Sequence, residues 1–270
     1  MNRQTGIIGY GHMGSMLAEG FLASGALEQE ELVVTSRSLT AAEALRTRYP
    51  GITLAADNAG LARRCDLVVL CVRPPDVQRV LDEIIPALRG DEHLVSIAAA
   101  PDLKTLEDAY PGPVTRAMPS ILSEVGRGTT LIAHESRTRT TEAERVERLF
   151  SAIGSVVRVG EENLAAATVI SGCGPALIAA ISEELLHAAV RGSDLTREDA
   201  GRLVRETLIG TAAYLEATGT SLEDLIRRVA TPGGITEAGV AALQTDLPPV
   251  LDAMFERMLA RNAALLSFGG

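Results

Sequence analysis

Short apolar runs alternate with amphipathic stretches through the first 160 residues of the chain. The runs are rich in β-branched residues, and helical patterns or loops separate them. This alternation predicts a Rossmann-like, doubly wound and mainly parallel α/β sheet. The predicted strands are Thr5–Gly9, Leu32–Ser36, Ile52–Ala55, Leu67–Val72, Leu94–Ala98, Val114–Ala117, Thr130–Ala133 and Val156–Val159.

In the second half of the chain the apolar positions recur with helical spacing instead. Several of these segments have start and stop signals. Thr196 and Ser221 each precede an Asp by three residues, a spacing that resembles an N-terminal capping pair. Gly192 and Gly219 stand where helices end. The predicted helices are Asn163–Ile170, Pro175–Val190, Glu198–Ala217, Leu222–Val229 and Val250–Leu266, and a further helix is expected from Thr236 onward.

The chain is thus predicted to contain an α/β domain, residues 1–160, followed by an all-α domain, residues 161–270. The last predicted helix has one apolar face, whose residues recur at i, i+3 and i+4. Such a face packs either against its own domain or against a second copy of the chain, and the pattern leaves both alternatives open. The face contains Leu251, Met254, Phe255, Met258, Leu259, Ala263 and Leu266.

Composition narrows the class of protein. The chain has 270 residues, 46% of them hydrophobic, which is enough for one or two well-packed cores. Its net charge of −10 and aromatic content of 3% disfavour a nucleic-acid partner. No apolar run is expected to approach the ~20 residues that span a bilayer, and the start of the chain lacks a secretory pattern. We therefore expect a cytoplasmic protein without a membrane partner.

Cysteine and histidine give no sign of a metal site. The three cysteines form no C-x-x-C pair, and the four histidines are scattered without ligand spacing. We predict no metal.

A glycine motif follows the first predicted strand. Gly9, Gly11 and Gly14 have the spacing Gly-x-Gly-x-x-Gly and enclose His12 and Met13 at the start of a predicted helix. The motif alone is weak, because glycine-rich turns between a strand and a helix are common. In this context it directs backbone N–H groups and the positive end of the helix toward a pyrophosphate. We interpret it as the phosphate-binding turn of a dinucleotide-binding fold.

The end of the second predicted strand indicates which dinucleotide binds. An NAD enzyme has Asp or Glu there, against the ribose 2′-hydroxyl. This chain has Ser36 and Arg37, and no carboxylate. A guanidinium group and hydroxyls suit a 2′-phosphate, which predicts a preference for NADP(H). The alternative is that Arg37 is only a solvated surface residue.

Two loops interrupt the helical half. Residues 171–176 read Ser-Gly-Cys-Gly-Pro-Ala, and residues 230–236 read Ala-Thr-Pro-Gly-Gly-Ile-Thr. Both offer backbone N–H groups at a helix start, and the second adds hydroxyls, which suits a carboxylate. Each alone is explained equally well as a turn between helices. Together with the glycine motif, they predict a small anionic substrate held where the helical domain faces the sheet.

The order of these motifs along nearly the whole chain resembles the pyrroline-5-carboxylate reductase family. The matching stretches are Gly9-Tyr10-Gly11-His12-Met13-Gly14, Ser36-Arg37-Ser38, Val72-Arg73-Pro74, Ser96-Ile97-Ala98-Ala99, Arg116-Ala117-Met118-Pro119, Ser171-Gly172-Cys173-Gly174-Pro175-Ala176 and Pro232-Gly233-Gly234-Ile235-Thr236.

The resemblance implies that NADPH delivers a hydride to the C=N carbon of a cyclic imino acid, 1-pyrroline-5-carboxylate, which yields L-proline. It implies that Thr236 and the backbone near Gly233 and Gly234 bind the substrate carboxylate, with Thr231 as a further candidate and Cys173 near the substrate. Thr236 is the candidate catalytic residue. No proton donor is assigned, because an imine nitrogen can arrive already protonated.

The resemblance also implies a homodimer formed through the C-terminal helices, often built into a larger ring of dimers. The helical half is then a substrate-binding and dimerisation domain. The residues implied for NADP(H) binding are Gly9, Gly11, His12, Met13, Gly14, Ser36, Arg37, Val72, Arg73, Pro74, Ala98, Ala99, Met118 and Pro119.

The chain departs from the family pattern at several of these positions. Two alternatives therefore stay open: a reductase of another cyclic imine or imino acid, and a catalytically silent NADP-binding protein with a regulatory role. The departures are Arg73 for Lys, Ala100 for Gly, Ser120 for Asn, Cys173 for Ser, Leu177 for Tyr and Ile235 for Thr or Ala.

Overall fold

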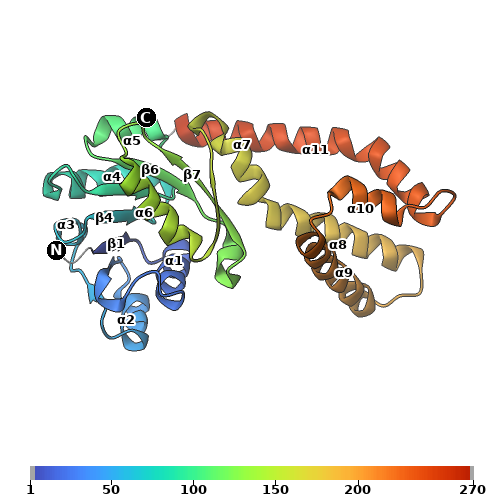
Figure 1. Ribbon diagram of the computed structural model, residues 1–270, viewed down its shortest axis with the longest axis horizontal. Helices are drawn as coiled ribbons and strands as arrows, with labels where there is room; N and C mark the ends of the chain where they lie inside the picture. Colours follow the sequence, from blue (N-terminus) through green and yellow to red (C-terminus); the bar gives the residue numbers. More distant parts are fainter. Residues whose placement is uncertain (1–3, 268–270) are drawn as a thin grey trace. The chain divides into compact units, whose positions relative to one another are not determined.

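The computed structural model describes residues 4–267. Contacts between residues divide the chain into two compact units (Figure 1). Among the described residues, the first, the sheet unit, contains residues 4–173 together with residues 258–267. The second, the helical unit, contains residues 174–257.

Within residues 4–267, the sheet unit is built on eight strands in the order β3-β2-β1-β4-β5-β6-β7-β8. All neighbouring strands are parallel except β6 and β7, which confirms the predicted doubly wound, mainly parallel sheet. The strand order reverses between β1 and β4, so the crevice of the fold opens at their carboxyl ends. The strands are β1 (Thr5–Ile8), β2 (Leu32–Thr35), β3 (Thr53–Leu54), β4 (Leu67–Leu70), β5 (His93–Ser96), β6 (Val114–Met118), β7 (Gly128–His134) and β8 (Gly154–Arg158).

Helices cover both faces of this sheet, because successive strand side chains point to opposite faces. Ile8 and Val68 belong to one buried cluster, with α3, α4 and α5, whereas Ile7 and Val69 belong to the other, with α1, α2 and α6. The helices are α1 (His12–Ala23), α2 (Leu39–Arg48), α3 (Asn58–Ala62), α4 (Pro74–Ile84), α5 (Leu103–Ala109) and α6 (Thr140–Ser151), and the 3-10 turns are η1 (Gln29–Glu31), η2 (Ile85–Ala87) and η3 (Ile121–Val125).

The rest of the chain is helical, as predicted. The Thr196 hydroxyl accepts the N–H of Asp199 at 3.1 Å, and the Ser221 hydroxyl accepts that of Asp224 at 3.0 Å, which confirms both caps. Gly219 ends its helix in the left-handed conformation, with φ +63°. The helices are α7 (Glu161–Ser171), α8 (Gly174–Gly192), α9 (Arg197–Thr218), α10 (Leu222–Val229) and α11 (Ile235–Ser267).

The last helix differs from its prediction. The pattern places its start at Val250, directly after two prolines, because proline usually interrupts a helix. In the structure α11 begins at Ile235 and continues through Pro248 and Pro249. The helix expected from Thr236 and the helix expected from Val250 are therefore one element.

Contacts group α7 with the sheet, beyond the domain boundary predicted at residue 160. The helix packs against β7, and its Leu164 is buried in the cluster that also holds Ile8. The division into residues 1–160 and 161–270 stays a prediction about functional domains, while the compact unit extends to Cys173.

The expectation that no apolar run approaches membrane-spanning length is wrong. Within residues 4–267, the stretch Glu161–Gly192 is long and apolar enough by length and composition, with a window of 18 residues whose mean hydropathy is 1.9. Only 17% of that window is buried within the chain. The sequence prediction treats α7 and α8 as two short helices. The glycine-rich break between them contains no charged residue, so the uncharged apolar stretch continues from one helix into the other.

The helical unit buries few residues of its own. Among residues 174–257, only Gly174, Leu186 and Ala200 are buried. Many large apolar side chains are exposed instead, including Ile178, Ile181, Leu185, Leu203, Ile209, Leu222, Val229 and Leu243. A unit with so small a core needs another surface to cover it.

A hydrogen-bonded chain of polar residues crosses the sheet at the amino end of β5. His93 is 3% exposed, and its Nε2 lies 2.7 Å from the hydroxyl of Thr115. The same hydroxyl lies 2.7 Å from Nδ1 of His134, whose Nε2 lies 3.0 Å from the carboxylate of Glu147. Burial, with a smaller contribution from His134, lowers the pKa of His93 to about 3. His93 is therefore neutral in the folded protein.

This pKa predicts a loss of stability in mild acid. Unfolded His93 binds a proton below about pH 6.5, whereas the folded residue does not until about pH 3, so stability falls as the pH drops through that window. Between pH 7 and pH 5 the loss from this residue is about 2 kcal/mol. Urea unfolding at both pH values, with wild type and His93→Gln, measures it: the variant should lose less stability. The matched control is His12→Gln, at an exposed histidine. Equal losses in wild type and His93→Gln would contradict the assignment.

Candidate functional site

The glycine turn after β1 fits closely against β4. Gly9 has φ +99°, and a Cβ there would lie 2.5 Å from the carbonyl oxygen of Cys71. A Cβ on Gly14 would collide with the carbonyl oxygen of Gly9. Nothing lies within 4 Å of a Cβ placed on Gly11, so that position faces open space. Two of the three glycines are thus required by the fold, and the third leaves room for a ligand.

The turn leads directly into α1. Gly11 is the N-cap, and no side chain caps the helix. The first N–H groups of a helix have no acceptor within it and carry partial positive charge, which favours an anion. The turn is also held from both sides: the N–H of Gly9 donates to the carbonyl of Thr35, and the N–H of Cys71 donates to the carbonyl of Ile8.

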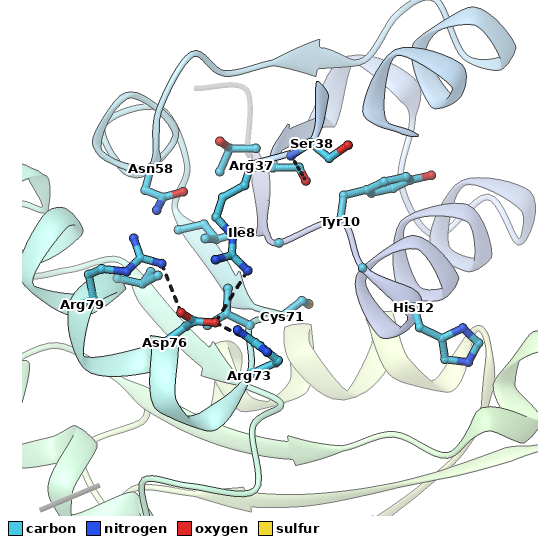
Figure 2. Close-up of a pocket in the computed structure, with 16 residues that line it drawn as sticks. Ile8, Tyr10, His12, Arg37, Ser38, Asn58, Cys71, Arg73, Asp76 and Arg79 are labelled. Atoms are coloured by element: carbon cyan, nitrogen blue, oxygen red, sulfur yellow. Dashed lines mark hydrogen bonds and ion pairs between the residues drawn. The ribbon is translucent and has the colours of Figure 1, made fainter. Parts of the chain in front are cut away.

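A cavity of about 450 Å³ opens at this point, over the carboxyl ends of β1, β2 and β4. A dinucleotide pyrophosphate fits this cradle, because it is the place where a doubly wound sheet binds such ligands. The cavity is lined by Ile8, Gly9, Tyr10, Gly11, His12, Thr35, Ser36, Arg37, Ser38, Asn58, Cys71, Val72, Arg73, Asp76, Arg79 and Val80 (Figure 2).

The structure brings together seven of the fourteen residues predicted to bind the cofactor: Gly9, Gly11, His12, Ser36, Arg37, Val72 and Arg73 line the cavity. Seven others do not line it: Met13, Gly14, Pro74, Ala98, Ala99, Met118 and Pro119. Gly14 lies under the turn, and Pro74 is the first residue of α4. Ala98 is buried two residues after the end of β5, and Met118 is buried at the end of β6. Both lie further along the same edge of the sheet.

Three arginines converge on one carboxylate at the wall of the cavity (Figure 2). Asp76 lies 3.8 Å from the guanidinium group of Arg37, 3.3 Å from that of Arg73 and 3.5 Å from that of Arg79. Burial alone would raise the pKa of Asp76, but the three cations lower it below its usual value. The guanidinium groups outnumber the carboxylate, so this wall favours an anionic ligand.

Three polar residues line this cavity without having been predicted from the sequence: Asn58, Asp76 and Arg79. The last two have a signal in the sequence, since Arg73, Asp76 and Arg79 follow one another at intervals of three at the start of α4. Asn58 has none, because its place in the cavity depends on the packing of α3 beside β1.

Two of the cysteines are candidates for a chemical role: Cys71, which lines the cavity, and Cys173, which is a predicted substrate residue. Burial raises the pKa of the Cys71 thiol, so it is not a nucleophile at neutral pH. Cys173 is half-buried, two residues after the end of α7, and its N–H donates to the carbonyl of Thr168. Within residues 4–267 no group of three His, Cys, Asp or Glu residues could hold a metal ion.

The segment that leads into α11 belongs to the helical unit and contains four of the five predicted substrate residues, whereas the fifth, Cys173, is grouped with the sheet unit. Gly233 has φ +75°, and the N–H of Gly234 donates to the carbonyl of Thr231 at 2.9 Å. A Cβ on Gly234 would lie 2.9 Å from both oxygens of Thr231. Both glycines are therefore needed for this turn. Thr236, half-buried, lies in the first turn of α11.

One backbone group of this loop already binds a carboxylate. The N–H of Gly233 donates to the side chain of Glu237 at 2.8 Å. A backbone N–H group at this helix start thus binds a carboxylate of the chain itself, and the role of the loop toward the substrate stays a prediction.

Comparisons with known proteins cover both units. A family model described as pyrroline-5-carboxylate reductase dimerisation matches residues 161–265, and one described as NADP oxidoreductase coenzyme F420-dependent matches residues 4–100. Pyrroline-5-carboxylate reductase 3 of Bacillus subtilis (strain 168) is 34% identical over 97% of this chain and 96% of its own length.

Two solved structures are similar over almost the full chain. A pyrroline-5-carboxylate reductase from Coxiella burnetii has a TM-score of 0.90 and 27% identity, covering 98% of this chain and 99% of that one. Plasmodium falciparum pyrroline carboxylate reductase, with NADP bound, has a TM-score of 0.82 and 27% identity, covering 100% and 99%.

The arginine cluster predicts selectivity for a 2′-phosphate. Arg37→Ala should weaken NADPH binding by roughly tenfold, the value of one charge-assisted hydrogen bond, and leave NADH binding unchanged. Titration of each nucleotide by fluorescence measures both affinities. Arg46→Ala, at an exposed arginine on α2, is the matched control and should change neither. If the ratio of NADPH affinity to NADH affinity were the same in Arg37→Ala as in wild type, Arg37 would be only a solvated surface residue.

Proposed function

Because the chain belongs to the pyrroline-5-carboxylate reductase family, we propose that it reduces 1-pyrroline-5-carboxylate to L-proline with NADPH. The observation that carries the proposal is the glycine turn, which only glycine can form at Gly9 and Gly14 and which opens onto the arginine cluster. The protein is an NADP-dependent oxidoreductase that acts on a CH–NH bond.

Each unit has a separate task in this reaction. When bound, the reduced nicotinamide supplies the hydride for the C=N carbon. The start of α1 holds the pyrophosphate, and Ser36 and Arg37 face the 2′-phosphate, with Arg73 beside them. The loop before α11 holds the substrate carboxylate, through backbone N–H groups and the hydroxyl of Thr236.

Thr231, Gly233 and Gly234 give that loop its shape. The φ of Gly233 and the close approach of Gly234 to Thr231 fix the direction of the N–H groups before any ligand arrives. A preformed carboxylate site reduces the entropy lost on binding and orients the imine carbon. That Cys173 and Ile235 are near the substrate is an implication of the family pattern alone.

Turnover is the direct test of the function. We expect the purified protein to oxidise NADPH, followed by absorbance, with 1-pyrroline-5-carboxylate as substrate and far more slowly with its six-membered homologue. Thr236→Ala should raise KM for the imino acid roughly tenfold, since one hydrogen bond to a charged group is lost, while NADPH affinity stays unchanged.

Thr236→Ser, which keeps the hydroxyl, is the matched control and should resemble wild type. Turnover of the homologue alone would indicate another cyclic imine. Tight NADPH binding without turnover of either would indicate a regulatory protein. An unchanged KM for the imino acid in Thr236→Ala would show that Thr236 does not bind the substrate carboxylate.

The exposed apolar residues of the helical unit support a homodimer. The matched dimerisation segment, residues 161–265, includes the whole unit and also the apolar stretch Glu161–Gly192. We infer that a second copy of the chain covers this stretch rather than a membrane, and that the protein is cytoplasmic. The family pattern further implies a ring of such dimers.

The dimer gives a prediction about α8. Ile181 and Leu185 are exposed by 49% and 62% and lie one turn apart on this helix. Replacing both with Glu should convert a dimer into a monomer, because buried carboxylates in an apolar interface are costly. Light scattering after size exclusion measures the mass. Arg191→Glu, at an exposed polar position on α8, should stay dimeric. A dimeric double variant would show that another surface forms the interface.

A further inference from the structure

Arg116 is a charged residue inside the sheet unit. It lies in β6, is 5% exposed, and stands opposite Ser96 of β5 and Ala133 of β7. Its Nη2 donates to the carbonyl oxygen of Ala99 at 2.8 Å and to that of Ala98 at 3.3 Å. One guanidinium group thus holds two successive carbonyls of the bend that follows β5.

Glu161 is the ionic partner of Arg116. Its Oε1 pairs with Nη1 of Arg116 and also accepts the N–H of Leu103, the first residue of α5, at 3.1 Å. Glu161 is the first residue of α7 and the first of the segment that matches the dimerisation model. The pair therefore joins the bend after β5, the start of α5 and the start of α7.

Stability alone accounts poorly for this pair. The Arg116 side chain is only 6% exposed and that of Glu161 29%, so much of their attraction is offset by the cost of removing these charges from water. Here Nε of Arg116 and Oε2 of Glu161 are buried with no hydrogen-bond partner among the described residues, which adds to that cost. What the pair provides is a fixed position for the backbone that it binds.

That backbone lies at the cofactor edge of the sheet. Ala98 and Ala99 follow the carboxyl end of β5. In the sheet β2, which Ser36 and Arg37 follow, lies on one side of β4, whereas β5 lies on the other side. A dinucleotide lies across the carboxyl ends of such a sheet, so its nicotinamide half reaches this side.

We propose that Arg116 is a positioning residue for the reaction. It fixes the bend at Ala98 and Ala99 against the nicotinamide half of the cofactor, and Glu161 ties that bend to the start of the dimerisation segment. The proposal rests on the proposed function, because it assumes that NADPH is the ligand of this edge.

Lysine cannot replace Arg116 in this role. The guanidinium group binds two carbonyls through Nη2 and a carboxylate through Nη1, whereas an ammonium group keeps the charge without that fork of two nitrogens. Arg116→Lys is therefore a conservative variant that removes the positioning and retains the charge. Its matched control is Arg145→Lys: Arg145 pairs with both carboxylate oxygens of Asp66, at 2.8 Å and 3.0 Å, at the amino end of β4.

The experiment compares these variants in three measurements. NADPH affinity by fluorescence, kcat with 1-pyrroline-5-carboxylate, and the thermal midpoint are determined for wild type, Arg116→Lys, Glu161→Gln and Arg145→Lys. We expect Arg116→Lys to weaken NADPH binding several-fold and to lower kcat by roughly 10-fold to 100-fold, the effect of a displaced reactant, with KM for the imino acid little changed. Arg145→Lys should lower only the thermal midpoint.

Coupling between the two partners gives a second criterion. Combining Arg116→Lys with Glu161→Gln should weaken NADPH binding no further than Arg116→Lys alone, because both act through one contact. If Arg116→Lys folds poorly, Glu161→Gln tests the same proposal. We expect it to lose less NADPH affinity than is expected for Arg116→Lys. NADPH affinity and kcat equal to those of Arg145→Lys would overturn the proposal. If wild type does not turn over the imine, the proposed function fails, and the NADPH titration still decides whether Arg116 positions the cofactor edge.

Discussion

The contact between the glycine turn and β4 is the constraint on which the sheet unit depends. Gly9 passes so close to the carbonyl of Cys71 that no other residue fits, and Gly14 brings α1 equally close to Gly9. These approaches set where α1 begins, and the start of α1 determines where its free N–H groups point. The strand order reverses at the same place, so the fold leaves its crevice at the end of the helix that attracts phosphate.

The two units are stabilised in different ways. Alternation along the strands gives the sheet a buried cluster on each face, so this unit has a core within one chain. The helical unit buries few residues and exposes many large apolar ones. The binding of a second copy then contributes directly to its stability, which makes that stability dependent on protein concentration. The loop before α11 belongs to this unit. Its shape is fixed mainly by its own contacts, in which the N–H of Gly234 donates to Thr231 and the N–H of Gly233 donates to Glu237.

Much of this structure could be predicted from the sequence because its signals are local. The eight strands, the glycine turn and the caps at Thr196 and Ser221 depend on neighbouring residues. The convergence of Arg37 with Asp76 depends on how β2 and α4 pack, which one sequence does not reveal. The ion pair of Arg116 and Glu161 likewise joins residues far apart in the chain. The path of α11 through its prolines contradicts a local rule, so local signals predict it wrongly.

The arginine cluster shows why local charge matters more than net charge at this site. The chain carries a net charge of −10, which would repel an anionic cofactor if it were evenly spread. Arg79 also pairs with Glu83, so Asp76 is left to balance Arg37 and Arg73. One carboxylate cannot neutralise two guanidinium groups, and a surplus of positive charge remains beside Ser36. Screening limits the distant carboxylates to a weak effect, so the surplus of positive charge within a few ångströms favours an anionic ligand in this cavity.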